Sequence, residues 1–198
     1  MSAARYGLFG GSFDPPHRAH VALARLARDH LQLDALFVVP AGDPWQKAHR
    51  TLQPAEHRLA MTALAFGGEA RIAVDPIELQ RQGPSYTLDT VRALQARQPG
   101  EWFLVIGQDQ YARIDTWHGW AELLPRVTLA VAARAGRLPE PPAALQGIAH
   151  RSIVLPLPAL PLSSSDVRMR LARREDVSTL VPPAVAGYIA QHHLYEKH

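Results

Sequence analysis

The sequence predicts a doubly wound α/β fold, in which a mostly parallel sheet carries helices on both faces. Short, continuously apolar runs alternate with longer segments of helical spacing, which is typical of a parallel sheet covered on both sides. Right-handed crossovers between such strands give the doubly wound arrangement. The segments richest in chemically active side chains each follow an apparent strand, at residues 10–20, 40–47, 107–118 and 163–168. Ligands of such sheets bind beyond the carboxyl ends of the strands, which makes these segments the expected site.

In the first half of the chain the predicted strands and helices alternate. Short apolar runs predict the strands, and apolar residues at helical spacing predict the helices. Ser85 or Thr87 is expected to cap the third helix, which Pro99 and Gly100 end. The predicted elements are a strand over Tyr6–Phe9, a helix over His17–His30, a strand over Leu36–Val39 that Pro40 ends, a helix over Ala55–Phe66, a strand over Arg71–Val74 and a helix over Ser85–Arg97.

The second half contains the clearest buried strand, Trp102–Ile106, and a second one over Val127–Ala132. The segment Ala135–Leu162 is rich in proline and lacks periodicity, so we expect a surface connection with one short strand, Ser152–Leu155. A helix over Pro182–His193 closes the chain, with two prolines at its start.

The length and composition fit one globular domain over 1–198, with 47% hydrophobic and 20% charged residues. No apolar run approaches the ~20 residues that span a bilayer. Residues Met1–Tyr6 lack the apolar core of a signal peptide. There is no cysteine, so disulfides and thiolate metal sites are excluded. We therefore expect a cytoplasmic protein without a membrane partner.

The charge favours small phosphorylated ligands over nucleic acid. The formal net charge is +3 and the isoelectric point is near 9.6. A mild positive field attracts phosphorylated metabolites, but it is too weak to indicate a nucleic-acid-binding protein. The most basic segment, Arg168–Arg174, fits the polar face of one helix. We therefore expect no nucleic-acid partner.

The segment Gly10–His20 has the properties of an anion-binding loop. Glycines after a strand let backbone N–H groups approach a phosphate, and the helix that follows presents its positive end. His17 and His20 lie at i and i+3, so both rings can project from one face of the first turn. Neither the dinucleotide fingerprint nor a P-loop is present, and a zinc site lacks a third ligand. The plain alternative is a strand–turn–helix connection with two surface histidines.

The same segment, Gly-Gly-Ser-Phe-Asp-Pro-Pro-His-Arg-Ala-His, resembles the signature of the nucleotidylyltransferase superfamily with the His-x-Gly-His motif. Ala19 stands where that family usually has glycine. Three further segments resemble the superfamily's nicotinate-nucleotide adenylyltransferases of bacteria in the right order. They are Gly83–Thr90, with its Ser-Tyr-Thr; Ile106–Asp109 with Thr116–Trp120; and Leu162–Arg168, with its Ser-Ser and Arg. The resemblance covers residues 7 to about 195 and implies a Rossmann-like nucleotidyltransferase fold.

The resemblance also implies the reaction. The phosphate of nicotinate mononucleotide would attack the α-phosphorus of ATP, giving deamido-NAD and pyrophosphate. Positioning and stabilisation of negative charge would supply most of the catalysis. Mg²⁺ is expected, bound mainly through the ATP phosphates. The expected partners are ATP and nicotinate mononucleotide, and the protein is expected to be a monomer or a small homo-oligomer.

Residue roles follow from the same resemblance. The catalytic candidates are His17, His20 and Arg168, with His20 on the α-phosphate and Arg168 on the leaving pyrophosphate. No side chain is assigned to a metal, and the helical part from about residue 163 would complete the ATP site. The ATP-binding candidates are Gly10, Gly11, Ser12, Phe13, His17, His20, Gly107, Asp109, Ser164, Ser165 and Arg168, and the acceptor-binding candidates are Lys47, Tyr86, Thr87, Trp117 and His118.

Simpler interpretations remain for several of these residues. Ser164 and Ser165 could merely cap a helix, Arg168 could be solvated, and Trp117 could be a core residue. Phosphopantetheine adenylyltransferase is the alternative enzyme, although the Ser-Tyr-Thr and Thr-Trp segments favour a pyridine nucleotide. A non-catalytic nucleotide sensor on the same fold is the alternative outside catalysis, and the complete set of phosphate donors argues against it.

Overall fold

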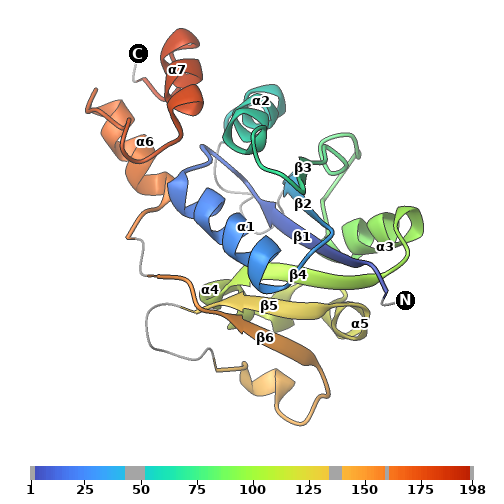
Figure 1. Ribbon diagram of the computed structural model, residues 1–198. Coiled ribbons are helices and arrows are strands. Elements are labelled where there is room, and N and C mark those ends of the chain that lie inside the picture. Colours follow the sequence, from blue (N-terminus) through green and yellow to red (C-terminus); the bar gives the residue numbers. More distant parts are fainter. Residues whose placement is uncertain (1–2, 43–51, 134–139, 159–160, 197–198) are drawn as a thin grey trace.

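The computed structural model describes residues 3–42, 52–133, 140–158 and 161–196. Within these residues one sheet is formed by six strands, in the order β3-β2-β1-β4-β5-β6, and every neighbouring pair is parallel (Figure 1). The strands are β1 (Arg5–Gly11), β2 (Ala35–Pro40), β3 (Ile72–Val74), β4 (Glu101–Gly107), β5 (Thr128–Ala132) and β6 (Arg151–Leu155). The predicted doubly wound α/β fold is confirmed, and the described sheet is parallel throughout.

The strand order reverses between β1 and β4. The chain builds outward from β1 to β3, and then returns to the centre and builds outward from β4 to β6. Loops that leave the carboxyl ends of β1 and β4 therefore turn to opposite faces of the sheet. The space between them is where doubly wound sheets bind ligands.

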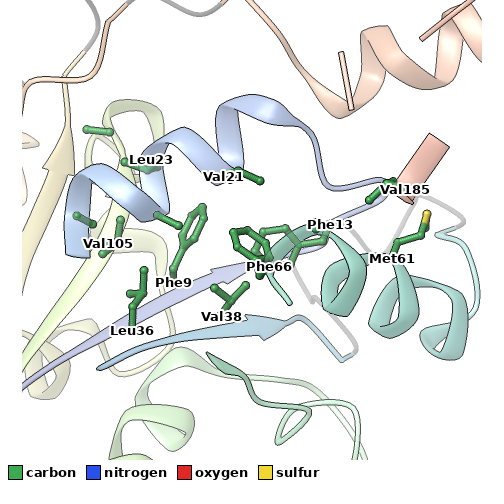
Figure 2. Close-up of a cluster of buried hydrophobic side chains, with 14 of the residues drawn as sticks. Phe9, Phe13, Val21, Leu23, Leu36, Val38, Met61, Phe66, Val105 and Val185 are labelled. Atoms are coloured by element: carbon green, nitrogen blue, oxygen red, sulfur yellow. The ribbon is translucent and has the colours of Figure 1, made fainter. Parts of the chain in front are cut away.

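One face of the sheet is covered by α1 (Arg18–His30) and α2 (Ala55–Phe66), while α6 (Ser164–Ala172) and α7 (Pro183–Gln191) extend the same core beyond the carboxyl ends of the strands. Alternate strand residues such as Phe9 and Val105 pack beneath them, as the two-residue repeat of a strand requires. Figure 2 shows Phe9, Phe13 and Phe66 gathered between the sheet and the helices. The carboxyl-terminal helices thus share a core with α1 and α2.

The opposite face is covered by α3 (Thr87–Arg97), α4 (Gln108–Tyr111) and α5 (Trp120–Arg126), and by the short 3-10 helices η2 (Ile114–Thr116) and η3 (Ala143–Leu145). Leu8, Leu104 and Leu129 supply the strand side of this second core. The central strand β4 is buried along almost its whole length because it contributes side chains to both cores.

Several boundaries differ from the sequence-based expectations. Gly10 and Gly11 belong to β1, opposite Val39 and Pro40 of β2, so the strand continues into the expected loop. Helix α1 begins one residue late, because His17 is extended at φ −134° and precedes the first turn. The helices α4 and α5 lie in a region expected to be a loop up to residue 118 and unassigned beyond it, and α5 includes a proline in its short run.

The expected cap of α3 is wrong. Tyr86 is the residue before the first turn, and its side chain makes no capping hydrogen bond. Ser85 is instead buried, with its hydroxyl beside Gly42 at the end of β2. The closing helix is also shorter than predicted. Among the described helices, none has the length and apolar character needed to cross a membrane.

Candidate active site

A cleft of about 570 Å³ opens at the point where the strand order reverses. The carboxyl ends of β1 and β4 form its floor, and the starts of α1, α3 and α6 form its walls. It brings together the predicted residues Gly10, Gly11, Ser12, His17, His20, Tyr86, Thr87, Gly107, Asp109, Trp117, His118, Ser164, Ser165 and Arg168. These residues come from distant parts of the chain, so their convergence depends on the tertiary fold.

Among the predicted residues that the structure describes, Phe13 is not part of this lining. The Phe13 side chain is only 1% exposed and packs edge-on against Phe9 and Phe66 in the core. A Cβ on Gly11 would lie 3.0 Å from the Phe13 ring, so this glycine makes room for the ring. Phe13 therefore has a structural side chain, and only its backbone remains a candidate for ATP. Lys47 lies outside the described residues.

The start of α1 places two histidine rings side by side. The rings of His17 and His20 stack with their centroids 3.7 Å apart and an interplanar angle of 23°. The backbone N–H of His17 donates to Nδ1 of His20 at 3.1 Å. Because Nδ1 accepts this bond, neutral His20 carries its proton on Nε2, which makes Nε2 the donor of the ring. Both rings lie on one face of the first turn, as their spacing predicts.

His17 is held in its neutral form. Its ring is 5% exposed, and burial lowers the pKa of His17 from 6.5 to about 4, against the opposing attraction of Asp166. Its buried Nδ1 has no hydrogen-bond partner among the described residues. An unsatisfied buried nitrogen at the wall of a cleft suits a ligand that supplies the missing partner.

The start of α6 forms the opposite wall. Ser163 is the capping residue, because its hydroxyl accepts a bond from the N–H of Asp166 at 3.2 Å. Ser164 donates its hydroxyl to the carbonyl of Pro15 at 2.9 Å and so holds α6 against the loop after β1. The expectation that Ser164 or Ser165 could be the cap is therefore wrong. Ser164 lines the cleft, but its hydroxyl proton is already donated to the carbonyl of Pro15.

Arg168 is fixed rather than solvated. Its guanidinium donates from Nη2 to the hydroxyl of Ser165 at 3.0 Å and from Nη1 to the carbonyl of Asp14 at 2.5 Å. Its side chain is 19% exposed and still lines the cleft. Arg168 and Ser165 therefore share the face of α6 that meets the cleft, which matches their helical spacing.

Arg58 of α2 is a buried cation at the base of the site that no sequence motif marks. It is 3% exposed and donates to the carbonyls of Ser12 at 3.2 Å and Ala41 at 2.6 Å. Burial lowers the pKa of Arg58, and attraction to Asp14 and Tyr195 opposes this effect. Arg58 thereby ties the carboxyl ends of β1 and β2 together. In the sequence it is one charged residue among many, so no pattern could have found it.

Glu78 is a second buried charge that sequence patterns did not reveal. Burial raises the pKa of Glu78, while hydrogen bonds from the Thr90 hydroxyl (2.8 Å) and the Gly42 N–H and attraction to Arg81 oppose the rise. The carboxyl group lines the cleft and links α3 to the end of β2. Glu78 thus supports the wall that carries the Ser-Tyr-Thr segment.

Aromatic rings line the side of the cleft near α3. The rings of Tyr86 and His118 stack with centroids 4.1 Å apart, and Trp117 packs partly against the second core. Trp117 Nε1 and Ser85 Oγ are buried and lack hydrogen-bond partners among the described residues. The residues that carry these atoms, together with His17, all line the same cleft. This wall combines flat apolar surface with unused hydrogen-bonding groups.

Comparison with known protein families agrees with this geometry. Residues 8–170 match the family described as cytidylyltransferase-like, and this range includes all the described residues that line the cleft. The chain belongs to this family. As a cytidylyltransferase-like protein, it carries the nucleotidyltransferase fold that its motifs predict.

Close relatives in the cytidylyltransferase-like family narrow the resemblance. A protein of Methylibium petroleiphilum named "Probable nicotinate-nucleotide adenylyltransferase" is 50% identical over 196 residues, which cover 96% of this chain and 92% of the relative. A protein of Bordetella petrii with the same name is 49% identical over 195 residues, covering 96% of this chain and 98% of the relative. The predicted resemblance to nicotinate-nucleotide adenylyltransferases is confirmed.

Solved structures confirm the fold. The nicotinic acid mononucleotide adenylyltransferase of Plasmodium falciparum, complexed with NaAD, superposes with a TM-score of 0.78 at 19% identity. The same protein complexed with APC gives a TM-score of 0.74, also at 19% identity. Each comparison covers 97% of both chains. The architecture is therefore shared along nearly the whole length despite the low identity.

Proposed function

We propose that this nucleotidyltransferase transfers AMP from ATP to nicotinate mononucleotide and releases pyrophosphate. The observation that carries the proposal is the single cleft at the strand-order reversal, whose walls hold both a phosphate-binding set and an aromatic set of residues. The names of the relatives support the same acceptor. The reaction requires two nucleotides to meet end to end, and the two walls offer one surface to each.

The triphosphate of ATP would bind between the starts of α1 and α6. Residues at the start of each helix line the cleft, and the positive dipole end of a helix favours an anion. His20 would donate from Nε2 to the α-phosphate as negative charge grows there, and Arg168 would hold the departing pyrophosphate. His17 would donate to a phosphate oxygen as a neutral ring.

The acceptor would bind beside α3 and Trp117. The flat indole offers a stacking surface for the pyridine ring. Tyr86 precedes α3 without a capping side chain, so the first N–H groups of this helix lack that acceptor. The nicotinate carboxylate would accept from backbone N–H groups near Thr87 and His118. Lys47 stays a candidate for the phosphate of the acceptor.

We further propose that Mg²⁺ accompanies ATP. The ion prefers oxygen ligands and usually keeps several waters while it binds substrate phosphates. Across the described part of the chain, no group of three or more His, Cys, Asp or Glu side chains is placed to hold a metal ion. The phosphates and water would then supply most of the ligands, and the ion would neutralise charge on the leaving pyrophosphate.

A comparison of acceptors tests the proposal. The protein is incubated with Mg-ATP and, separately, nicotinate mononucleotide, nicotinamide mononucleotide or phosphopantetheine, and pyrophosphate release is measured. We expect kcat/KM for the nicotinate form to exceed that for the amide by on the order of a hundredfold, because the amide cannot replace a carboxylate that accepts several N–H bonds.

Each other outcome contradicts part of the proposal. Equal use of nicotinamide mononucleotide would contradict the proposed binding of the nicotinate carboxylate to backbone N–H groups. A preference for phosphopantetheine would show that nicotinate mononucleotide is not the acceptor. Tight ATP binding without product from any acceptor would favour the alternative of a non-catalytic nucleotide sensor.

A further inference from the structure

The carboxyl-terminal segment reaches the phosphate side of the site through a buried carboxylate. Asp14 lies between β1 and α1, is 1% exposed and does not line the cleft. The hydroxyl of Tyr195 donates to Asp14 Oδ1 at 2.7 Å. Tyr195 comes from beyond α7, 181 residues further along the chain. Two distant segments thus meet directly behind the wall that carries the phosphate-binding candidates.

The backbone after α7 is shaped to deliver this hydroxyl. His193 and Tyr195 both adopt positive φ angles, 49° and 67°, which are unfavourable for residues other than glycine. Leu194 is 7% exposed and anchors the turn in the core, and its N–H donates to the carbonyl of Ile189 at 3.1 Å. Such conformations persist where the surroundings hold them in place.

Asp14 in turn holds Arg168. The backbone carbonyl of Asp14 accepts from Nη1 of Arg168, whereas its carboxylate Oδ2 stays 3.9 Å from the same nitrogen. The carboxylate therefore attracts the guanidinium without a direct hydrogen bond. Tyr195 satisfies the other oxygen, Oδ1, and fixes the orientation of the group. A carboxylate without this donor would turn toward Arg168 and compete with a phosphate for it.

We propose that Tyr195 is a positioning residue for the ATP side of the cleft. Through Asp14 it fixes the loop after β1 and keeps the Arg168 guanidinium available to the triphosphate. This inference rests on the proposed function only in placing ATP phosphates beside Arg168. Tyr195 does not line the cleft, so it acts through Asp14 and not as part of the cleft wall.

The test is Tyr195→Phe, which removes one hydroxyl and leaves the ring. We expect the Kd for Mg-ATP, measured by calorimetry without acceptor, to rise about tenfold, because a hydrogen bond to a charged group is lost. In kinetic assays the KM for ATP should rise similarly, kcat should fall severalfold, and the KM for nicotinate mononucleotide should stay within about twofold.

Tyr188→Phe is the matched control. Tyr188 lies in α7, and its hydroxyl is 3.0 Å from Nδ1 of His57 in α2, so this variant also removes one hydrogen-bonded phenol hydroxyl. We expect it to keep the wild-type Kd for Mg-ATP while its thermal unfolding shifts as much as that of Tyr195→Phe. A merely structural role for Tyr195 would give both variants the same binding and kinetics.

A double-mutant cycle isolates the route through Asp14. Asp14→Asn and Tyr195→Phe should each weaken ATP binding, and the double variant should be no weaker than the worse single variant. Independent, multiplying effects, or a Tyr195→Phe variant with the wild-type Kd, would overturn the inference. Because ATP binding is measured alone, these results hold whichever acceptor the wild-type protein uses. If the wild-type protein does not bind Mg-ATP, both the proposed function and this inference fail.

Discussion

His17 and His20 lie three residues apart, yet their surroundings give them different properties. Burial lowers the pKa of His17 to about 4 and leaves its Nδ1 without a partner, whereas His20 accepts the His17 N–H. A neutral ring has one N–H that can donate to a phosphate, without carrying a positive charge. The pair therefore offers two adjacent rings to the cleft, of which His17 is held neutral by burial.

The depressed pKa of His17 predicts how stability depends on pH. Above pH 6.5 the ring is neutral in both the folded and unfolded states. Between 6.5 and about 4 the unfolded chain binds the proton more readily, so the folded state loses stability as the pH falls. We expect the free energy of unfolding to fall by roughly 2 kcal/mol from pH 7 to pH 5 because of this residue.

Urea unfolding at both pH values checks this prediction. His17→Gln should lose less stability than the wild type on acidification. His30→Gln, which changes an exposed histidine at the end of the same helix, should behave like the wild type. A parallel decline of wild type and His17→Gln would show that His17 is not the group responsible.

At the scale of the elements, three helices begin at the cleft and each begins differently. Helix α1 starts with the histidine pair, α6 has the hydroxyl cap of Ser163, and α3 has no capping side chain. An uncapped helix start leaves N–H groups that a ligand can satisfy. The starts of α1 and α3, whose preceding residues make no side-chain cap bond, therefore differ from the capped start of α6.

The start of α5 depends on Gly119, which follows the acceptor candidates Trp117 and His118. Gly119 has φ 66°, and an added Cβ would lie 2.4 Å from Leu88 Cδ2 of α3. We expect Gly119→Ala to destabilise the protein by about 1–3 kcal/mol. The KM for the acceptor should rise more than that for ATP, because α3 and Trp117 form the acceptor wall.

Gly147→Ala provides the control for backbone strain. Gly147 has φ 82° with nothing within 4 Å of an added Cβ, and it does not line the cleft. The Gly147→Ala variant should lower the free energy of unfolding by about 1 kcal/mol and leave the KM for ATP and the KM for the acceptor unchanged. Thermal unfolding and steady-state kinetics of both variants show whether the contact with α3 contributes to the effect of Gly119→Ala beyond backbone strain. Equal changes in the two variants would exclude the α3 contact as the cause.

At the scale of the whole molecule, the strand order determines where the chemistry lies. The reversal between β1 and β4 separates loops that turn to opposite faces, and the cleft forms between them. The carboxyl-terminal helices share the core of α1 and α2, so α6 is held rigidly across from the loop after β1. Figure 1 shows α6 near the start of α1, and α7 next to α2.

This arrangement predicts how metal removal acts. Because the described residues contain no cluster able to hold a metal ion, EDTA should leave the thermal unfolding of the nucleotide-free protein unchanged. It should abolish turnover and most of the stabilisation that ATP provides, because the ion binds with the phosphates. A drop in unfolding temperature on adding EDTA alone would instead reveal a metal site within the protein.

Much of the site could be predicted from local sequence. The glycines before a helix, the paired histidines at i and i+3, and the Ser-Ser…Arg spacing each encode their geometry within a few residues, and those residues line the cleft. The strands were predicted within one or two residues because burial on both faces makes them continuously apolar. The position of Phe13 in a motif does not show which way its ring points, and only the structure shows that the ring packs in the core.

The sequence by itself determined the alternation of strands and helices, the segments proposed to bind phosphate and the family, because these depend on periodicity and short-range spacing. Only the tertiary structure decided which distant groups meet. Arg58 on the carbonyls after β1 and β2, Glu78 beneath α3, and Tyr195 on Asp14 are long-range contacts between single residues. No local pattern encodes them, because packing of the whole chain brings such residues together.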